Sequence, residues 1–179
     1  MKTNRTLLLL LAAAGLLIPL QVSAATLDLP DGSKLDLETE CPVCTMKIAG
    51  GTPGPSAVVF KDGKVVGFDG ASDLFRYMFA SDKHGFDPAN VKTLYTTDYS
   101  TKKFIDAKGA FFVLDSMVEG SMGPEVIPFS KKEDAEKFKT EHKGNKVVTY
   151  SEVKADDVKP KKKMLKMKHD EGSGHKMKH

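Results

Sequence analysis

Three sulfur atoms lie close together in the segment Cys41-Pro-Val-Cys44-Thr-Met46. Thiolates three positions apart can close on one ion, and a thioether two residues later can add a third sulfur. Soft donors of this kind select copper(I), because polarizable sulfur matches a polarizable cation of low charge. The segment therefore predicts a Cu(I) site formed by Cys41, Cys44 and Met46.

The same two cysteines, which are the only ones in the chain, are compatible with other chemistry. A Cys-x-x-Cys pair is also typical of thiol–disulfide oxidoreductases. Zinc is less favoured, because closed zinc sites use four Cys or His ligands and no histidine is near in sequence. The residues alone leave a copper site and a thiol oxidoreductase as alternatives.

Further methionines and histidines could extend a metal site. Met122 lies between glycines in Gly120-Ser-Met-Gly-Pro124, where the simplest interpretation is a turn whose methionine packs into the core. The last sixteen residues hold six more donors: Met164, Met167, His169, His175, Met177 and His179. Such tracts are typical of metal-binding tails. A passive copper buffer, in which the tail does most of the binding, is therefore a third interpretation.

Motifs of the common enzyme classes are absent from the sequence. There is no serine nucleophile elbow, no phosphate-binding loop and no HExxH. No spacing among the aspartates distinguishes acid–base partners from turn and cap residues. We therefore predict a binding protein that is not an enzyme and has no catalytic residues.

The first 24 residues have the three parts of a secretory signal peptide. Lys2 and Arg5 are positively charged, residues 7–20 are almost wholly apolar, and Val22-Ser-Ala24 is a small-residue cleavage signal. The apolar run is shorter than the ~20 residues of a membrane span, and no later run approaches that length. We expect cleavage after residue 24 and a soluble, exported periplasmic protein without a transmembrane segment. This compartment excludes nucleic acid as a partner.

Positive charge is concentrated in the last part of the chain. The whole sequence has a formal net charge of +3, but residues 154–179 contain nine lysines against four acidic residues. Such a segment is typical of a disordered tail, which could contact metal or, weakly, anionic surfaces. We predict a tail over 154–179 that follows a folded body over 40–153.

The body begins after a polar segment, 25–39, that we interpret as a leader or an edge strand. Residues 57–60 and 65–68 are apolar runs on either side of an Asp-Gly turn, which predicts a hairpin. A helix capped by Asp69 or Ser72 follows and stops by Gly85 and Pro88, and residues 91–97 form a closing strand. The apolar residues that define the helix are Leu74, Phe75, Met78 and Phe79.

A second series of elements repeats this order. Strands are expected over 104–107, 110–114 and 125–129, then a helix over 131–142 and a last strand over 146–150. Ser130 is the expected helix cap, with Glu133 placed for a capping box. The repetition predicts an α+β protein of two related ββαβ halves, about 40–100 and 101–153.

An ordered series of short motifs resembles the nitrous oxide reductase accessory protein family, NosL, over about residues 40–153. The motifs are Cys41-Pro-Val-Cys44-Thr-Met46, Phe68-Asp-Gly70, Asp73-Leu-Phe75, Tyr95-Thr-Thr-Asp98-Tyr99, Ile105-Asp-Ala107, Met122-Gly-Pro124, Pro128-Phe129 and Asp134-Ala-Glu136-x-Phe138.

The resemblance implies a two-part ββαβ architecture, similar to that of organomercurial lyase relatives. It also implies a copper(I) chaperone whose client is the apo form of nitrous oxide reductase or a related cuproenzyme. Carried over by position, the copper ligands would be Cys41, Cys44, Met46 and Met122.

Two features depart from the family pattern. Ala25 and Thr26 follow the predicted signal peptide, where members typically carry an acylated cysteine. Thr45 stands where the family usually has glycine. The first departure favours a soluble periplasmic form, and the two together leave the client enzyme open.

Overall fold

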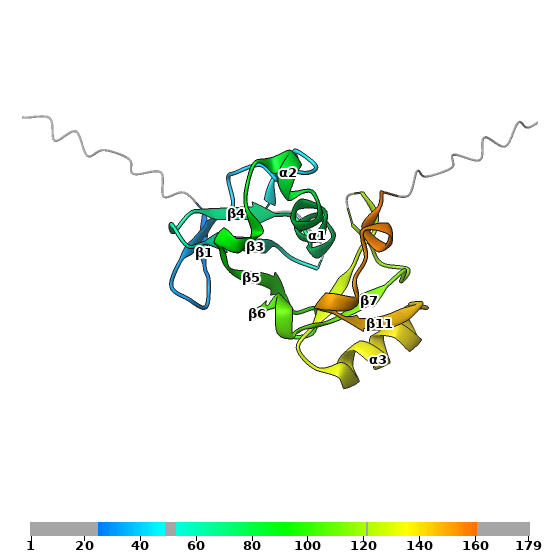
Figure 1. Cartoon of the computed structure of the whole chain (residues 1–179). Helices are drawn as coiled ribbons and strands as arrows, with labels where there is room; N and C mark the ends of the chain where they lie inside the picture. The colour runs from blue at the N-terminus through cyan, green and yellow to red at the C-terminus, as the bar shows by residue number, and fades with distance from the viewer. Residues whose placement is uncertain (1–24, 49–52, 121, 161–179) are drawn as a thin grey trace, which may run out of the picture.

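Two antiparallel sheets with a helix between them form the centre of the protein (Figure 1). The structure, a computed structural model, describes residues 25–48, 53–120 and 122–160. The predicted signal peptide and residues 161–179 of the predicted tail lie outside these residues.

The first sheet has four strands in the order β4-β3-β5-β6. Its strands are β3 (Ser56–Phe60), β4 (Val65–Phe68), β5 (Val91–Thr97) and β6 (Phe104–Asp106). Between β4 and β5 the chain forms α1 (Ala71–Phe79), α2 (Ser81–His84) and the 3-10 turn η2 (Pro88–Asn90). The Asp-Gly hairpin, the helix and the closing strand predicted for this half are therefore present.

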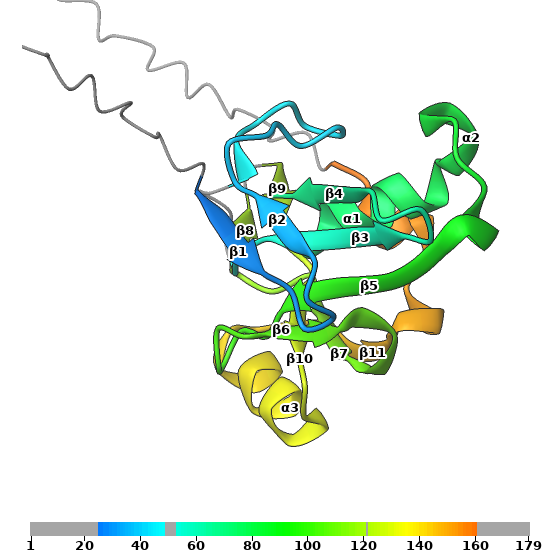
Figure 2. The ribbon, with the colours of Figure 1, turned by 90° about the vertical axis from the view of Figure 1, so that its left-hand side faces the viewer.

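The second sheet has three strands in the order β10-β7-β11, with one helix on its outer face (Figure 2). The elements of this half are η3 (Ala107–Gly109), β7 (Phe111–Leu114), β8 (Glu119–Gly120), β9 (Gly123–Pro124), β10 (Ile127–Phe129), α3 (Lys132–Glu141), β11 (Lys146–Thr149), η4 (Tyr150–Glu152) and η5 (Ala155–Val158). Strands β8 and β9 form a small separate hairpin.

The two halves share one topology. In each three-stranded unit, the strand that comes first in the chain is the central one. Thus β3 lies between β4 and β5, and β7 lies between β10 and β11. The predicted α+β class is confirmed. Strand β6 differs from its expected place in the second series, because it pairs with β5. The Asp98 carboxylate accepts hydrogen bonds from the backbone of Ser100 and Thr101 and so closes a tight β5–β6 turn.

The predicted side-chain caps of the two main helices are wrong, although the helices themselves are present. Gly70 is the N-cap of α1 and Lys131 that of α3, and neither helix has a capping side chain of its own. The Ser130 backbone N–H donates to Asp98 at 2.7 Å instead of Ser130 capping α3. Tertiary contacts have thus replaced the local caps that the sequence favours.

Helix α1 packs against both sheets, so the two halves share one core. Phe75 of α1 is buried and makes an edge-to-face contact with Phe112 of β7, with ring centroids 5.1 Å apart. On its other side α1 contacts β3 and β4. The outer face of the second sheet packs on α3 through a separate cluster: Val113, Ile127, Phe129, Ala135 and Phe138.

The segment before the cysteines is part of the fold. It forms a hairpin of β1 (Thr26–Asp28) and β2 (Lys34–Asp36). Leu29 and Leu35 are buried against Ala57 and Val59, on the face of the first sheet opposite α1. The hairpin therefore covers an apolar face, which makes it more than a leader.

The folded chain also continues past residue 153. Val158 in η5 is 4% exposed and belongs to the core that surrounds α1. The Arg76 side chain of α1 donates a hydrogen bond to the Val158 backbone oxygen. The first residues of the predicted tail are thus held against α1.

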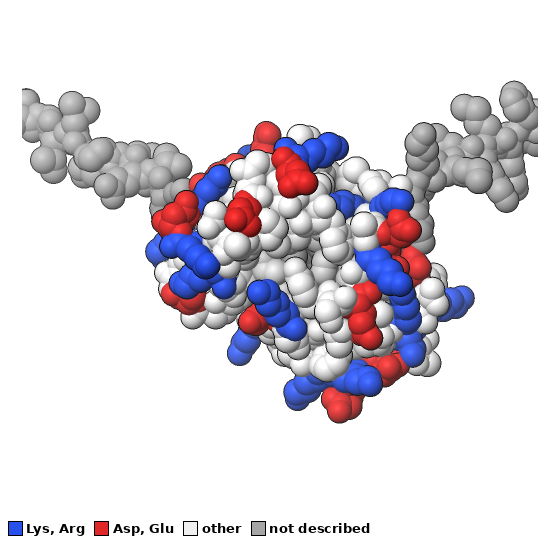
Figure 3. All heavy atoms as spheres, in the orientation of Figure 1, with Lys and Arg blue, Asp and Glu red and all other residues white. Residues whose placement is uncertain are grey.

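Charged side chains of both signs lie around the edge of the face shown in Figure 3, and its centre is largely uncharged. This face therefore offers no single-sign field that would select an anionic or a cationic partner. Among the residues that the structure describes, no helix is long and apolar enough to cross a membrane.

The shared core predicts a strong effect of one aromatic residue. Phe75→Ala should lower the free energy of unfolding by about 3–5 kcal/mol, because it leaves a cavity between the halves. Phe79→Ala on the same helix should cost much less, since Phe79 is 48% exposed. Denaturant titration measures both. Equal losses, or separate unfolding transitions for the two halves, would contradict the shared core.

Candidate metal centre

The cysteine pair lies in a short turn and not at the start of a helix. The Cys41 N–H donates to the Met46 backbone oxygen at 2.8 Å, and the Thr45 N–H donates to that of Cys41 at 2.8 Å. Thr45 has a φ of 61°, in the left-handed region that disfavours β-branched residues. A glycine at this position would adopt the same conformation without strain.

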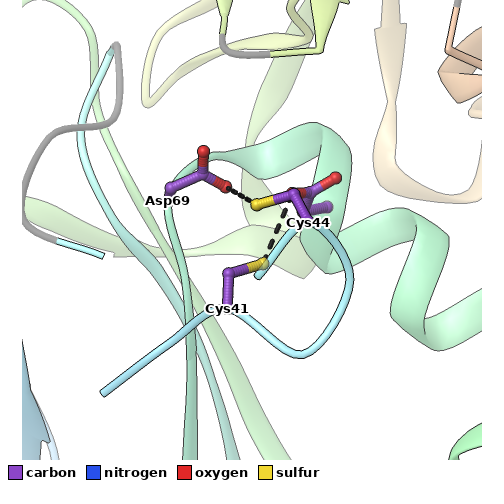
Figure 4. A group of neighbouring side chains, drawn as sticks. Cys41, Cys44 and Asp69 are labelled. Atoms are coloured by element: carbon purple, nitrogen blue, oxygen red, sulfur yellow. Dashed lines mark hydrogen bonds between the residues drawn. The ribbon is translucent and has the colours of Figure 1, made fainter. Parts of the chain in front are cut away.

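The fold brings two aspartates to the cysteines. The Cys41 thiol donates to Asp73 Oδ2 with a sulfur–oxygen distance of 3.3 Å, and the Cys44 thiol donates to Asp69 Oδ1 at 3.4 Å. One ligand atom from each of the four residues lies within 4.8 Å of all the others. Figure 4 shows the Asp69 carboxylate pointing toward the Cys44 sulfur, with the Cys41 sulfur on the same side. These distances suit four donors around one ion.

Separate elements position the four residues. Asp69 directly follows β4, and Asp73 lies in the first turn of α1. Sequence reasoning missed both aspartates as site residues, because it treated them as turn and cap residues. The available signal was their place in the Phe68-Asp-Gly and Asp73-Leu-Phe motifs that carry the family resemblance.

Burial and the neighbouring carboxylates keep both cysteines protonated in the metal-free site. Burial raises the pKa of the Cys41 thiol, and the negative charge of Asp73 adds to this effect. Burial likewise raises the pKa of the Cys44 thiol, which also donates a hydrogen bond to a carboxylate. Neither cysteine has the lowered pKa of a reactive redox thiol.

Asp73 is the charged centre of the site. Burial opposes its ionisation, but hydrogen bonds from its neighbours, including Cys44 and Arg76, outweigh burial and lower its pKa. Arg76 forms a largely buried salt bridge with Asp73 and also bonds to Val158. One arginine thus connects the candidate metal centre with η5.

Both predicted thioether ligands are exposed. Met46 is 36% exposed at the end of the cysteine turn. Met122 is 38% exposed between β8 and β9, so it does not pack into the core as the simplest sequence interpretation held. The structure therefore brings Cys41 and Cys44 together with the aspartates and leaves both methionines accessible at the surface.

Glu125, which directly follows the β8–β9 hairpin, is the buried acid beside this site. It is 7% exposed, and its Oε1 accepts a hydrogen bond of 2.7 Å from the Ser72 backbone N–H in the first turn of α1. Burial raises the Glu125 pKa from 4.5 to about 7, and the negative charge of Asp73 contributes. Glu125 was not among the residues singled out from the sequence.

The donor set of the four-residue cluster is mixed. Two thiolates suit soft Cu(I), and exposed thioethers could complete a sulfur-rich site. Two thiolates with two carboxylates could also hold Zn²⁺ in a tetrahedral site. The carboxylates of Asp69 and Asp73 supply the two further zinc ligands that nearby cysteines and histidines could not provide.

Comparison with known proteins places the chain in a family. The NosL family profile matches residues 33–158. The chain belongs to the NosL family. A crystal structure described as the copper chaperone NosL from Shewanella denitrificans is 31% identical, covers 68% of this chain and 93% of its own, and has a TM-score of 0.59. Membership in NosL confirms the resemblance recognised from the motifs.

A solution NMR structure of apo-NosL from Achromobacter cycloclastes is a more distant match. It is 22% identical, covers 57% of this chain and 87% of its own, and has a TM-score of 0.44. Among curated proteins, no significant sequence match was found.

The raised Glu125 pKa predicts a pH dependence of stability in the metal-free protein. The folded state holds this proton up to about pH 7, whereas the unfolded chain releases it near pH 4.5. The free energy of unfolding should therefore fall as pH rises between these values, by about 3 kcal/mol from this group.

Glu125→Gln should remove this fall, because an uncharged amide oxygen can still accept from Ser72. Denaturant titrations at pH 4.5, 6 and 7.5 measure the effect. Glu133→Gln, an exposed acid on α3, is the control and should keep the wild-type slope. An unchanged slope in Glu125→Gln would refute the assignment.

Proposed function

We propose that this chain is a periplasmic Cu(I) metallochaperone that receives copper at Cys41 and Cys44, with Met46 and Met122 as thioether ligands. It delivers the ion to an apo cuproenzyme, and the family resemblance makes nitrous oxide reductase the expected client. The protein acts as a carrier and not as an enzyme, with copper as its cargo.

One observation carries the proposal: two free thiols converge in one turn that also carries an exposed thioether. Cys41 is 1% exposed and anchors the site, Cys44 is partly buried, and Met46 is 36% exposed. Membership in a family with a copper chaperone of known structure adds support. Such a site combines affinity for copper with access for the client enzyme.

Copper uptake must displace the thiol protons. Thiolate, not thiol, is the metal ligand, so binding of Cu(I) releases protons and strengthens as pH rises. The carboxylates of Asp69 and Asp73 already accept these protons in hydrogen bonds and are the nearest groups that could relay them. Arg76 offsets part of the negative charge that the thiolates introduce.

Release of copper follows from the different exposure of its ligands, which rises from Cys41 to Met46. A client ligand can reach copper from the side of Met46 and Cys44, and each protein bond can be replaced in turn. Thioethers carry no proton, so their exchange does not depend on pH. Buried Cys41 is then the last ligand to leave, which keeps the ion bound until the client holds it.

The thiol oxidoreductase alternative has less physical support. The pair begins no helix whose dipole could stabilise a thiolate, and the pKa values of both thiols are raised. An insulin-reduction assay separates this activity from copper binding.

Removal of either thiol should weaken copper binding by orders of magnitude. The experiment is anaerobic Cu(I) titration of reduced protein against a competing chelator, on wild type, Cys41→Ser and Cys44→Ser. Circular dichroism should show an unchanged fold, and Ser100→Ala, at an exposed serine in the β5–β6 turn, is the control. Unchanged affinity in both cysteine variants would exclude the proposed site. A Zn²⁺ competition establishes which metal the mixed donor set prefers.

The role of the tail can be tested by truncation after Pro160. This end point preserves Val158, which packs in the core and accepts the Arg76 hydrogen bond, whereas truncation after residue 153 would remove both. The shortened protein should keep its high-affinity Cu(I) site and lose only weaker binding. Loss of the high-affinity site in the truncated protein would support the passive-buffer alternative.

A further inference from the structure

A single buried carboxyl joins two segments that are distant in sequence, the start of α1 and the end of the β8–β9 hairpin. Glu125 Oε1 accepts from the Ser72 backbone N–H, and the Val126 N–H donates to Ser72 Oγ at 2.9 Å. These two reciprocal bonds connect positions more than fifty residues apart and both are buried. Glu125 thereby supplies the capping acceptor that α1 lacks locally.

Two glycines make room for this carboxyl. A Cβ on Gly70 would lie 2.9 Å from Glu125 Oε1, and a Cβ on Gly120 would lie 2.4 Å from Oε2. Gly70 is the N-cap of α1, and Gly120 ends β8. The carboxyl therefore sits in a close-fitting space between the start of α1 and the base of the β8–β9 hairpin.

The same hairpin carries Met122. Strands β8 and β9 pair Glu119 with Pro124 and Gly120 with Gly123, which places Met122 in the connecting turn. Glu125 is three positions after Met122, so their Cα atoms lie within roughly 11 Å of each other. Glu125 also contacts Ser72, and Ser72 directly precedes Asp73 of the candidate metal centre.

We propose that Glu125 is a positioning residue, which holds the β8–β9 hairpin against α1 and so presents the Met122 thioether to copper bound at Cys41 and Cys44. The inference rests on the proposed copper-binding function and adds the device that connects Met122 to the cysteine site. Glu125 itself does not touch the ion.

A double-mutant cycle tests this coupling. Glu125→Ala and Met122→Ala should each weaken Cu(I) binding roughly tenfold, the lower end of the effect of residues that orient metal ligands. The double variant should bind no more weakly than either single variant. Glu125→Gln should bind Cu(I) as tightly as wild type, because its amide oxygen can accept the hydrogen bond from the Ser72 N–H. Glu133→Ala is the control and should bind as wild type.

Gly120→Ala provides a second variant that leaves Glu125 in place. Its methyl group would displace the carboxyl, so it should reproduce the loss seen for Glu125→Ala even if that variant folds poorly. X-ray absorption on the copper-loaded protein should show one sulfur ligand fewer in Met122→Ala, Glu125→Ala and Gly120→Ala. A residue with a purely structural role would leave this count unchanged.

Hydrogen exchange of the metal-free protein measures the Glu125–Ser72 hydrogen bond independently of copper. The Ser72 amide should be protected in wild type and in Glu125→Gln, and should exchange faster in Glu125→Ala. Additive losses in the cycle, or an unchanged sulfur count in Glu125→Ala, would overturn the positioning role alone.

The remaining outcomes separate the two proposals. If Met122→Ala binds Cu(I) as tightly as wild type while the cysteine variants do not bind, the positioning role fails and the chaperone function stands. If wild type does not bind Cu(I), the proposed function fails, and the role of Glu125 in copper binding fails with it.

Discussion

The start of helix α1 is the constraint on which the rest of the structure depends. Its first turn carries Asp73, follows Asp69 by two residues, and has no capping side chain of its own. The acceptor comes from Glu125 in the other half of the chain. An uncapped and buried helix end would be costly. This contact therefore ties the two halves together beside the candidate metal site. Further along the same helix, Phe75 joins both sheets in one core.

This arrangement gives the metal centre a rigid side and an accessible side. Cys41 belongs to the buried core, and Asp73 is held by Arg76, which in turn bonds to Val158 of η5. Met46 and Met122 lie at the surface. Rigid support lowers the entropy cost of assembling the ligands, whereas exposed thioethers allow stepwise exchange. The copper-carrier function that we propose needs both properties, because the ion must be held tightly and still be transferred.

Burial and the charges of the site favour the protonated thiols in the absence of metal. The buried Cys41 thiol and the partly buried Cys44 thiol face two carboxylates, so their protonated forms are favoured. A soft cation that binds thiolates strongly can replace the protons, and the positive charge of the ion then offsets the crowding of negative groups. The same electrostatics works against disulfide exchange, which requires an accessible thiolate. Metal binding and redox chemistry both need the thiolate. A bound cation supplies the positive charge that stabilises it, whereas a free redox thiol has no such charge at this site.

The sequence by itself determined the local features: the Asp-Gly hairpin, the helix and closing strand of the first half, the repeated ββαβ order, and Cys41, Cys44 and Met46 within one short segment. Each depends on periodicity, turn chemistry or spacing over a few residues. Only the tertiary structure decided that Asp69 and Asp73 face the cysteines, that Glu125 caps α1, that β6 pairs with β5, and that Leu35 and Val158 are core residues. These features depend on contacts between segments distant in sequence. Such contacts follow from how whole faces pack against one another, and local patterns carry no record of that packing.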